Sequence, residues 1–219
     1  MTSPRFHYCA AALSLLAASL PAQAEEPEKT LNTVVVTGNR GGQPRTVTDS
    51  PSPIDVISAE QLQASGKVGL KELLARLLPS FNLPAINGGG TSWSVRGVTM
   101  RGLSGDQVLV LVNGKRRHNT ALINNLARIG TAAVPVNLDL IPVSAIDHIE
   151  VLRDGASAQY GSDAIAGVIN IILKENDSGG SAETSFGQYD SGDGDTVHQT
   201  LNYGLALPND GFANLALDS

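Results

Sequence analysis

Apolar residues recur with helical spacing in the first half of the chain. Four leucines stand at positions i, i+3, i+4 and i+7, namely Leu70, Leu73, Leu74 and Leu77. This spacing predicts an amphipathic helix over residues 70–78, which Pro79 stops. A shorter helix is predicted just before it, because Ser58 and Gln61 have the identities and the spacing of a capping box.

Short apolar runs predict buried strands on both sides of these helices. Residues 54–57, 108–112, 149–152 and 168–173 are rich in Val, Ile and Leu. The run 108–112 has no polar residue at all, which is typical of a strand that is buried on both faces. Asn113-Gly114 follows it and predicts a tight turn.

The pattern changes to strict alternation after Lys174. Val197, Leu201, Tyr203, Leu205 and Leu207 alternate with polar or small residues. An alternating stretch of about ten residues indicates a strand with one apolar face. Residues 208–211 predict a turn, a further strand begins at Phe212, and residues 181–189 are a weaker strand candidate.

The first residues have the pattern of an export signal. Arg5 precedes a short apolar run at residues 10–20, and Ala22-Gln23-Ala24 fits a small-x-small cleavage site. We therefore expect residues 1–24 to be a signal peptide and the mature chain to begin at Glu25. The alternative is a buried N-terminal helix. Cys9 is the only cysteine, so disulfides and thiol chemistry are not expected in the mature chain.

Charge and motifs exclude several function classes. The formal net charge is -6, and nucleic-acid binding requires clustered basic residues, so no nucleic-acid partner is expected. His118, His148 and His198 lack the spacing of metal ligands, and no nucleotide-binding or nucleophile motif is found. The sequence predicts neither an enzyme, nor a cofactor, nor a metal site.

A β-branched run at residues 33–37 lies between two flexible stretches. It has no neighbour in sequence to pair with, so its backbone groups are available to another chain. The alternative is an ordinary first strand of the following domain.

The residues from Asp154 to Ile172, DGASAQYGSDAIAGVINII, resemble the end of the plug of TonB-dependent outer-membrane receptors. Residues 149–153, 108–114 and 53–79 resemble earlier plug elements in the same order, and residues 33–37 lie where this family keeps its TonB box. The resemblance implies an α+β plug domain, with a mixed small sheet and short helices, followed by the first strands of a truncated transmembrane β-barrel.

The implied organisation has four parts. Residues 1–24 are the signal peptide, and 25–53 are a periplasmic segment with the TonB box at 33–37. Residues 54–174 are the plug domain, and 175–219 are the first barrel strands of an incomplete barrel. Barrels of this family have about 22 strands, and at about ten residues per strand the tail supplies at most about three.

The resemblance also implies a function. The chain is expected to be the plug portion of a transporter in the cell outer membrane, which takes up a scarce small ligand such as a metal chelate, for example a ferric siderophore. TonB is the expected partner and would add a strand at Thr33, Val34, Val35, Val36 and Thr37. The alternative is a free-standing periplasmic plug-like module that binds a ligand without entering the membrane.

Two groups of candidate site residues follow from this. Arg116, Arg117 and His118 belong to a basic run that would face an anionic ligand, or else form a solvated edge. Arg101, Glu150 and Arg153 are expected to contact the barrel wall. For Glu150 and Arg153 the alternative is a local ion pair.

Overall fold

The computed structural model describes two short strands, β1 (Val34–Val35) and β2 (Arg45–Thr46), and then residues 53–64, 69–83, 97–123, 133–188 and 192–219. All of these belong to one unit, Asn32–Ser219. The predicted signal peptide lies outside the described residues.

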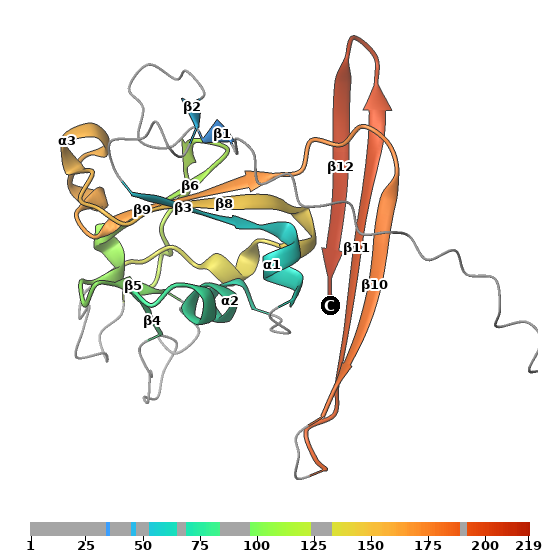
Figure 1. Cartoon of the computed structure of the whole chain (residues 1–219), viewed down its shortest axis with the longest axis horizontal. Coiled ribbons are helices and arrows are strands. Elements are labelled where there is room, and N and C mark those ends of the chain that lie inside the picture. Colours follow the sequence, from blue (N-terminus) through green and yellow to red (C-terminus); the bar gives the residue numbers. More distant parts are fainter. Residues whose placement is uncertain are drawn as a thin grey trace, which may run out of the picture. The chain divides into compact units, whose positions relative to one another are not determined.

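A five-stranded mixed sheet forms the centre of the domain (Figure 1). Its order is β3-β8-β9-β6-β7, and β6 pairs with β9 in parallel while the other neighbours are antiparallel. The bounds are β3 Ile54–Ser58, β6 Val108–Val112, β7 Lys115–Arg116, β8 Ile146–Leu152 and β9 Gly167–Leu173. Each predicted apolar run is a strand of this sheet.

Two helices lie between β3 and β6 in the chain. The capping box is confirmed: Ser58 N donates to Gln61 Oε1 at 3.0 Å, and Gln61 N donates to Ser58 Oγ at 3.3 Å, at the start of α1 (Ala59–Ala64). The periodic leucines form α2 (Leu70–Leu77), and Leu70, Leu73 and Leu74 are buried. These leucines share one core with Val110, Ile149 and Ile169, so α2 packs on one face of the sheet.

A smaller cluster covers the opposite face. It contains Leu109, Leu111, Leu152 and Val168, together with Ala156 and Ala164, which flank α3 (Ser157–Tyr160). Val108 and Val110 belong to the larger core, whereas Leu109 and Leu111 belong to this one. Strand β6 has apolar residues throughout because alternate side chains enter two different clusters.

The remaining elements of the domain are short. β4 (Phe81–Asn82) pairs with β5 (Thr99–Met100). The 3-10 turns among the described residues include η3 (Gly105–Gln107), η4 (Leu138–Leu140), η5 (Val143–Ala145) and η6 (Ser162–Ala164). The sequence predicts a helical turn at 141–146 with Pro142 as its first residue. The turn instead begins at Val143, with Pro142 at the N-cap position, and Ile146 already belongs to β8.

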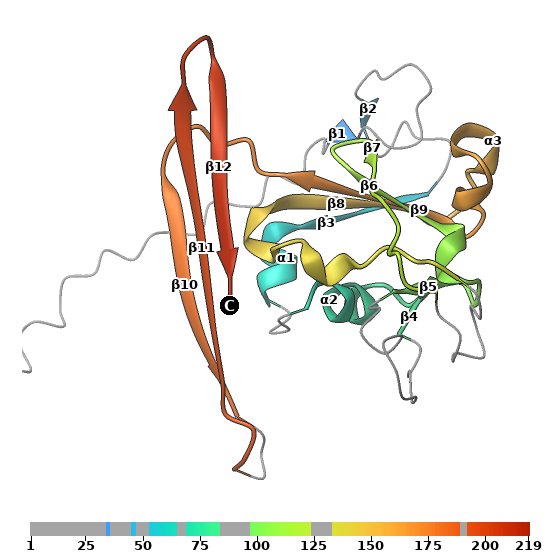
Figure 2. The same ribbon diagram turned by 180° about the vertical axis from the view of Figure 1, so that it is seen from behind.

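A second, open sheet follows the domain. β10 (Gly180–Gly187), β11 (Thr196–Leu207) and β12 (Gly211–Asp218) form an antiparallel sheet in that order (Figure 2). Three residues, 208–210, connect β11 to β12. Asn209 and Asp210 have positive φ values of 61° and 58° there, which Asn and Asp adopt more readily than most other residues. The alternation in the sequence is therefore confirmed as strand structure.

No helix in the part of the chain that the structure describes has the length and apolarity needed to cross a membrane.

Candidate functional site

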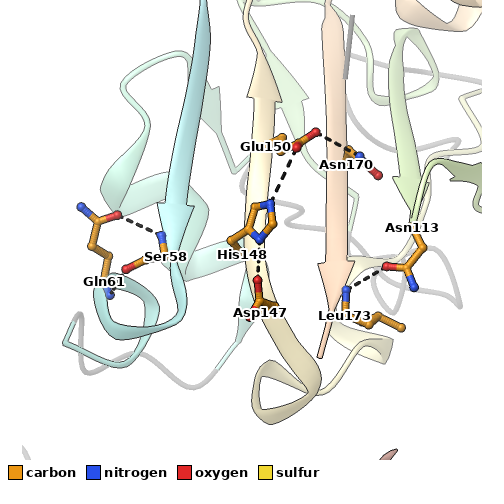
Figure 3. Close-up of polar contacts among 8 residues, drawn as sticks. All are labelled: Ser58, Gln61, Asn113, Asp147, His148, Glu150, Asn170 and Leu173. Atoms are coloured by element: carbon orange, nitrogen blue, oxygen red, sulfur yellow. Dashed lines mark hydrogen bonds and ion pairs between the residues drawn. The ribbon is translucent and has the colours of Figure 1, made fainter. Parts of the chain in front are cut away.

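A carboxylate and an amide lie opposite each other in the middle of the central sheet. Glu150 of β8 is in register with Asn170 of β9, and their side chains are 0% and 1% exposed. Asn170 Nδ2 donates to Glu150 Oε2 at 3.1 Å (Figure 3). A buried carboxylate costs free energy unless it is hydrogen-bonded or paired, so this bond helps to stabilise Glu150 inside the domain.

His148 extends the polar group along β8. It lies two residues before Glu150, on the same face of the strand, and its Nε2 is 3.7 Å from Glu150 Oε1. Its Nδ1 is 2.6 Å from Asp147 Oδ2 (Figure 3). The Glu150 carboxylate raises the pKa of His148 and outweighs burial, which lowers it, and Asp147 raises the pKa further. Protonated His148 would supply a positive charge next to buried Glu150.

The same network holds the turn between β6 and β7. Gly114 N donates to Asn170 Oδ1 at 3.0 Å, and Leu173 N donates to Asn113 Oδ1 at 2.8 Å (Figure 3). Asn113 and Gly114 have φ values of 47° and 74°, which Asn and Gly adopt more readily than other residues. The position of the basic run after this turn is thus fixed by Asn170.

The predicted ligand residues have different surroundings. The Arg116 guanidinium contacts the Asp163 carboxylate and donates to the Tyr160 carbonyl oxygen, so it connects β7 to the α3–η6 segment. Arg116, Arg117 and His118 all line a pocket of about 180 Å³, together with Asp106 and Asp163 among other residues. The three residues share a mixed-charge recess, in which the Arg116 guanidinium is already engaged by Asp163 and Tyr160.

The residues predicted to contact the wall make bonds within the domain. Arg153 Nε is 2.7 Å from Asp55 Oδ2, so the local ion pair is present. Arg101 has a φ of 56°, and it donates to the Arg153 carbonyl oxygen at 3.2 Å. Glu150 is buried in the sheet and lies 3.7 Å from His148 Nε2, as in the local alternative, and its contact with the barrel wall stays a prediction. Its position in the sequence did not show which face of β8 it occupies or what covers that face.

The predicted TonB-binding run is partly described. Val34 and Val35 form β1, which pairs antiparallel with Arg45 and Thr46 of β2. The expectation that this run has no partner in its own chain is therefore corrected. Thr33, Val36 and Thr37 lie outside the described residues, and β1 as a TonB-binding strand stays a prediction.

One contact between the domain and the second sheet was missed from the sequence. Asp218 of β12 accepts hydrogen bonds from Val143 N at 2.8 Å and from Ser144 Oγ at 2.7 Å. Next to it is a cavity of about 500 Å³, whose lining includes Val143, Gln63 and Ser185. An aspartate 75 residues away gives no local pattern that would have identified it.

Among the described residues, no three His, Cys, Asp or Glu side chains come together as a metal site.

Known proteins with a similar sequence or fold are transporters and receptors. Residues 46–168, just over half of the chain, match the TonB-dependent Receptor Plug Domain family. The vitamin B12 transporter BtuB of Vibrio vulnificus is 33% identical over 190 residues, which are 86% of this chain and 28% of the relative. BtuB of Photobacterium profundum is 35% identical over 163 residues, which are 74% and 24%.

Solved structures give the same result. The siderophore receptor PirA from Acinetobacter baumannii matches with a TM-score of 0.54 and 27% identity, over 78% of this chain and 25% of that chain. The ferric yersiniabactin uptake receptor FyuA from Yersinia pestis, at 22% identity and a TM-score of 0.51, matches over 76% and 24% and shows the shared fold alone. The chain thus spans less than a third of the length of these relatives.

Proposed function

Since the chain belongs to the family of the TonB-dependent receptor plug domain, we propose that it is the plug portion and first wall strands of an outer-membrane transporter that takes up a small metal chelate. In this proposal residues 1–24 direct export and are removed. The plug closes the lumen, and TonB supplies energy through residues 33–37.

The two-faced sheet β10-β11-β12 carries the proposal. One face collects large apolar side chains that are between 41% and 79% exposed, namely Phe186, Val197, Leu201, Tyr203, Leu205, Leu207, Leu215 and Leu217. Contiguous exposed apolar surface marks a region that another apolar phase or partner covers. Alternating strands of about ten residues are how outer-membrane barrels meet lipid.

The other face of the sheet is mostly polar, with Phe212 as its large apolar residue, and it supports the position of the plug. It includes Glu183, His198, Asn202, Asn214 and Asp218, and Asp218 is bonded to the domain. A barrel wall with a lipid face and a polar lumen face has this distribution. A free-standing periplasmic module would instead leave the apolar face and both sheet edges in water, where they favour aggregation.

The ligand class rests on the relatives and on the basic run. The relatives include a vitamin B12 transporter and siderophore receptors. We infer a ligand of this kind, a small metal chelate, with Arg117 and His118 as the first candidates for contacts to its anionic groups. Arg116 is a weaker candidate because Asp163 and Tyr160 already engage it.

TonB would bind by strand addition at residues 33–37. Each strand of a two-stranded sheet has one free edge, and β1 uses only one of its edges to pair with β2. An added strand at the other edge gains main-chain hydrogen bonds. Arg101 and Arg153 are half-exposed and remain candidates for contacts to other parts of the wall.

Uptake in living cells tests this function. Val35→Pro removes one backbone donor from the TonB-binding run, and Val35→Thr keeps the donor and the β-branch. In cells that make the gene product carrying this chain, labelled cyanocobalamin and a labelled ferric siderophore are supplied separately. We expect uptake of one of them to be lost with Val35→Pro and retained with Val35→Thr, while binding to the cells stays unchanged.

Uptake that survives Val35→Pro would contradict the TonB assignment. A chain that is found in the soluble periplasmic fraction, with no uptake of either ligand, would contradict the transporter.

A further inference from the structure

The turn η5 of the domain lacks a local acceptor for its first donors. Pro142 stands at the N-cap position and has no side-chain cap. The turn closes through Ala145 N, which donates to the Pro142 carbonyl oxygen at 3.1 Å, and through Ile146 N, which donates to the Val143 carbonyl oxygen. Ser144 is 7% exposed. Buried donors of this kind need an acceptor, because leaving one unpaired costs free energy.

That acceptor comes from β12. The two oxygens of Asp218 are divided between the two donors, with Oδ2 on Val143 N at 2.8 Å and Oδ1 on Ser144 Oγ at 2.7 Å. Hydrogen bonds to an ionised carboxylate are among the stronger ones in proteins. One side chain thus completes a turn that lies 74 and 75 residues earlier in the chain.

The strand presents Asp218 on the correct face. Asp218 pairs with Thr200 on the polar face of the sheet, whereas its neighbour Leu217 pairs with Leu201 on the apolar face and is 57% exposed. Since side chains alternate along a strand, only every second residue of β12 can reach η5. Asp218 and Leu217 are therefore a matched pair of test positions, because Asp218 faces the domain and Leu217 faces away from it.

A second attachment lies on the same face, four residues earlier in β12. Asn214 Nδ2 donates to Asn176 Oδ1 at 2.5 Å, and Asn202 Nδ2 donates to Asn214 Oδ1 at 2.6 Å. Asn176 belongs to the segment that joins β9 to β10. These amides hold the connection between the sheets, so β12 is fixed at its middle and can position Asp218 at its end.

We propose that Asp218 is a positioning residue that docks the domain on the β10-β11-β12 sheet by capping the turn Val143–Ala145 from another element. This inference rests on the proposed function in one respect, namely that the docked state would be the plug in its place against the barrel wall. The contact itself is testable without ligand, TonB or uptake.

Chemical cross-linking tests the geometry. In the full chain with Cys9→Ser, Ser144→Cys is combined either with Asp218→Cys or with Leu217→Cys, and the protein is treated in detergent with the shortest bifunctional thiol reagent. A bifunctional reagent is used because a direct disulfide requires Cβ atoms about 4 Å apart. We expect the 144/218 pair to link more efficiently than the 144/217 pair, because the bond between Asn176 and Asn214 still holds β12 when the Asp218 carboxylate is replaced. Equal yields for the two pairs would overturn the proposal.

Hydrogen exchange tests the dependence on the carboxylate. Asp218→Ala should speed exchange of the Val143 amide about tenfold or more, because it loses a hydrogen bond to a charged group. The Ala145 amide, which is bonded to Pro142, and the amides of β8 and β9 serve as internal controls for folding. Asp218→Asn keeps one carbonyl acceptor and should restore part of the protection, and Asp177→Ala, which removes an exposed carboxylate, should change nothing. An unchanged Val143 amide in Asp218→Ala would refute the docking role.

A distant reporter separates docking from a merely local bond. Gln63 and Ser185 line the cavity from α1 and from β10. With cysteines at both positions, cross-linking by a longer flexible reagent should fall severalfold when Asp218→Ala is added. The same yield with and without Asp218 would show that the domain is seated by other contacts and would overturn the proposal.

Discussion

Replacing Asn170 by aspartate changes a single atom at the centre of the sheet. Asn170 Oδ1 accepts from Gly114 N at 3.0 Å, and Nδ2 donates to Glu150 Oε2 at 3.1 Å. Asn170→Asp keeps the first bond and puts a carboxylate oxygen in place of the second donor. Two carboxylates would then face each other at fully buried positions.

The size of the effect follows from the distance. Two negative charges about 3 Å apart repel by about 5 kcal/mol at an effective dielectric constant of about 20. The pair avoids most of this repulsion by binding a proton, which requires one carboxyl pKa to rise from about 4 to above 7 and costs about 4 kcal/mol at neutral pH. We expect the variant to lose about 3–5 kcal/mol, a large share of the 5–15 kcal/mol typical of a domain.

The pH dependence has a definite sign. A carboxyl whose pKa is raised by folding favours the folded state only when protonated, so stability is lost as pH rises through the raised value. The deficit of Asn170→Asp should therefore be largest at neutral pH and should shrink toward about pH 4. Protonation of Glu150 also weakens its hydrogen bond to Asn170 in the wild-type chain. The wild type therefore loses stability at low pH, and the deficit of the variant shrinks further.

Urea unfolding followed by circular dichroism, in detergent and over this pH range, measures the deficit. Asn119→Asp is the matched control, because it introduces the same charge at an exposed position. A deficit below about 1 kcal/mol at pH 7, or one that grows on acidification, would refute the reasoning. Either result would mean that Glu150 and Asn170 are not held together in a water-excluded sheet.

Three further variants test separate contacts. Ser58→Ala removes a confirmed capping bond and should cost about 1 kcal/mol in the same urea assay. Gly204→Ala places a methyl group against the side chain and carbonyl oxygen of Asn176, so it should expose the segment between β9 and β10 to protease. The control Gly187→Ala, whose new methyl group would be 3.9 Å from its nearest atom, should not. His148 has a raised pKa, so its stabilisation is present below its ordinary value of 6.5 and is lost as pH rises through the raised value. The stability difference between the wild type and His148→Gln should therefore fall as the pH rises above the ordinary His pKa of about 6.5, and a constant difference would contradict the assignment.

Local patterns in the sequence predicted the elements well. The leucine spacing gave α2 to within one residue, the capping box gave the start of α1, and Asn113-Gly114 gave the β6–β7 turn. Strict alternation gave β11. These succeed because each depends on a few neighbouring residues whose chemistry already favours one local conformation.

Side-chain partners across the sheet could not be predicted in this way. The sequence identified Glu150 and Arg153 as polar residues near the end of a strand, but not that Glu150 is buried and Arg153 pairs with Asp55. Those outcomes depend on the order β3-β8-β9, which brings together residues about a hundred positions apart. Strand order is set by the packing of the whole domain, and no single segment encodes it.

The interior of the domain and its contact with the next sheet are stabilised by different kinds of interaction. Its interior is held by apolar contacts and by one buried carboxylate whose partners lie in the same domain. Its contact with the next sheet depends on short polar side chains, Ser144 with Asp218 and Asn176 with Asn214. Apolar burial resists opening in proportion to the area exposed, whereas a hydrogen bond can be exchanged for one to water at a modest net cost. In the proposed transporter, a plug that stays folded while it shifts against the barrel wall would use this division, and Asp218→Ala would measure the contribution of the polar contact.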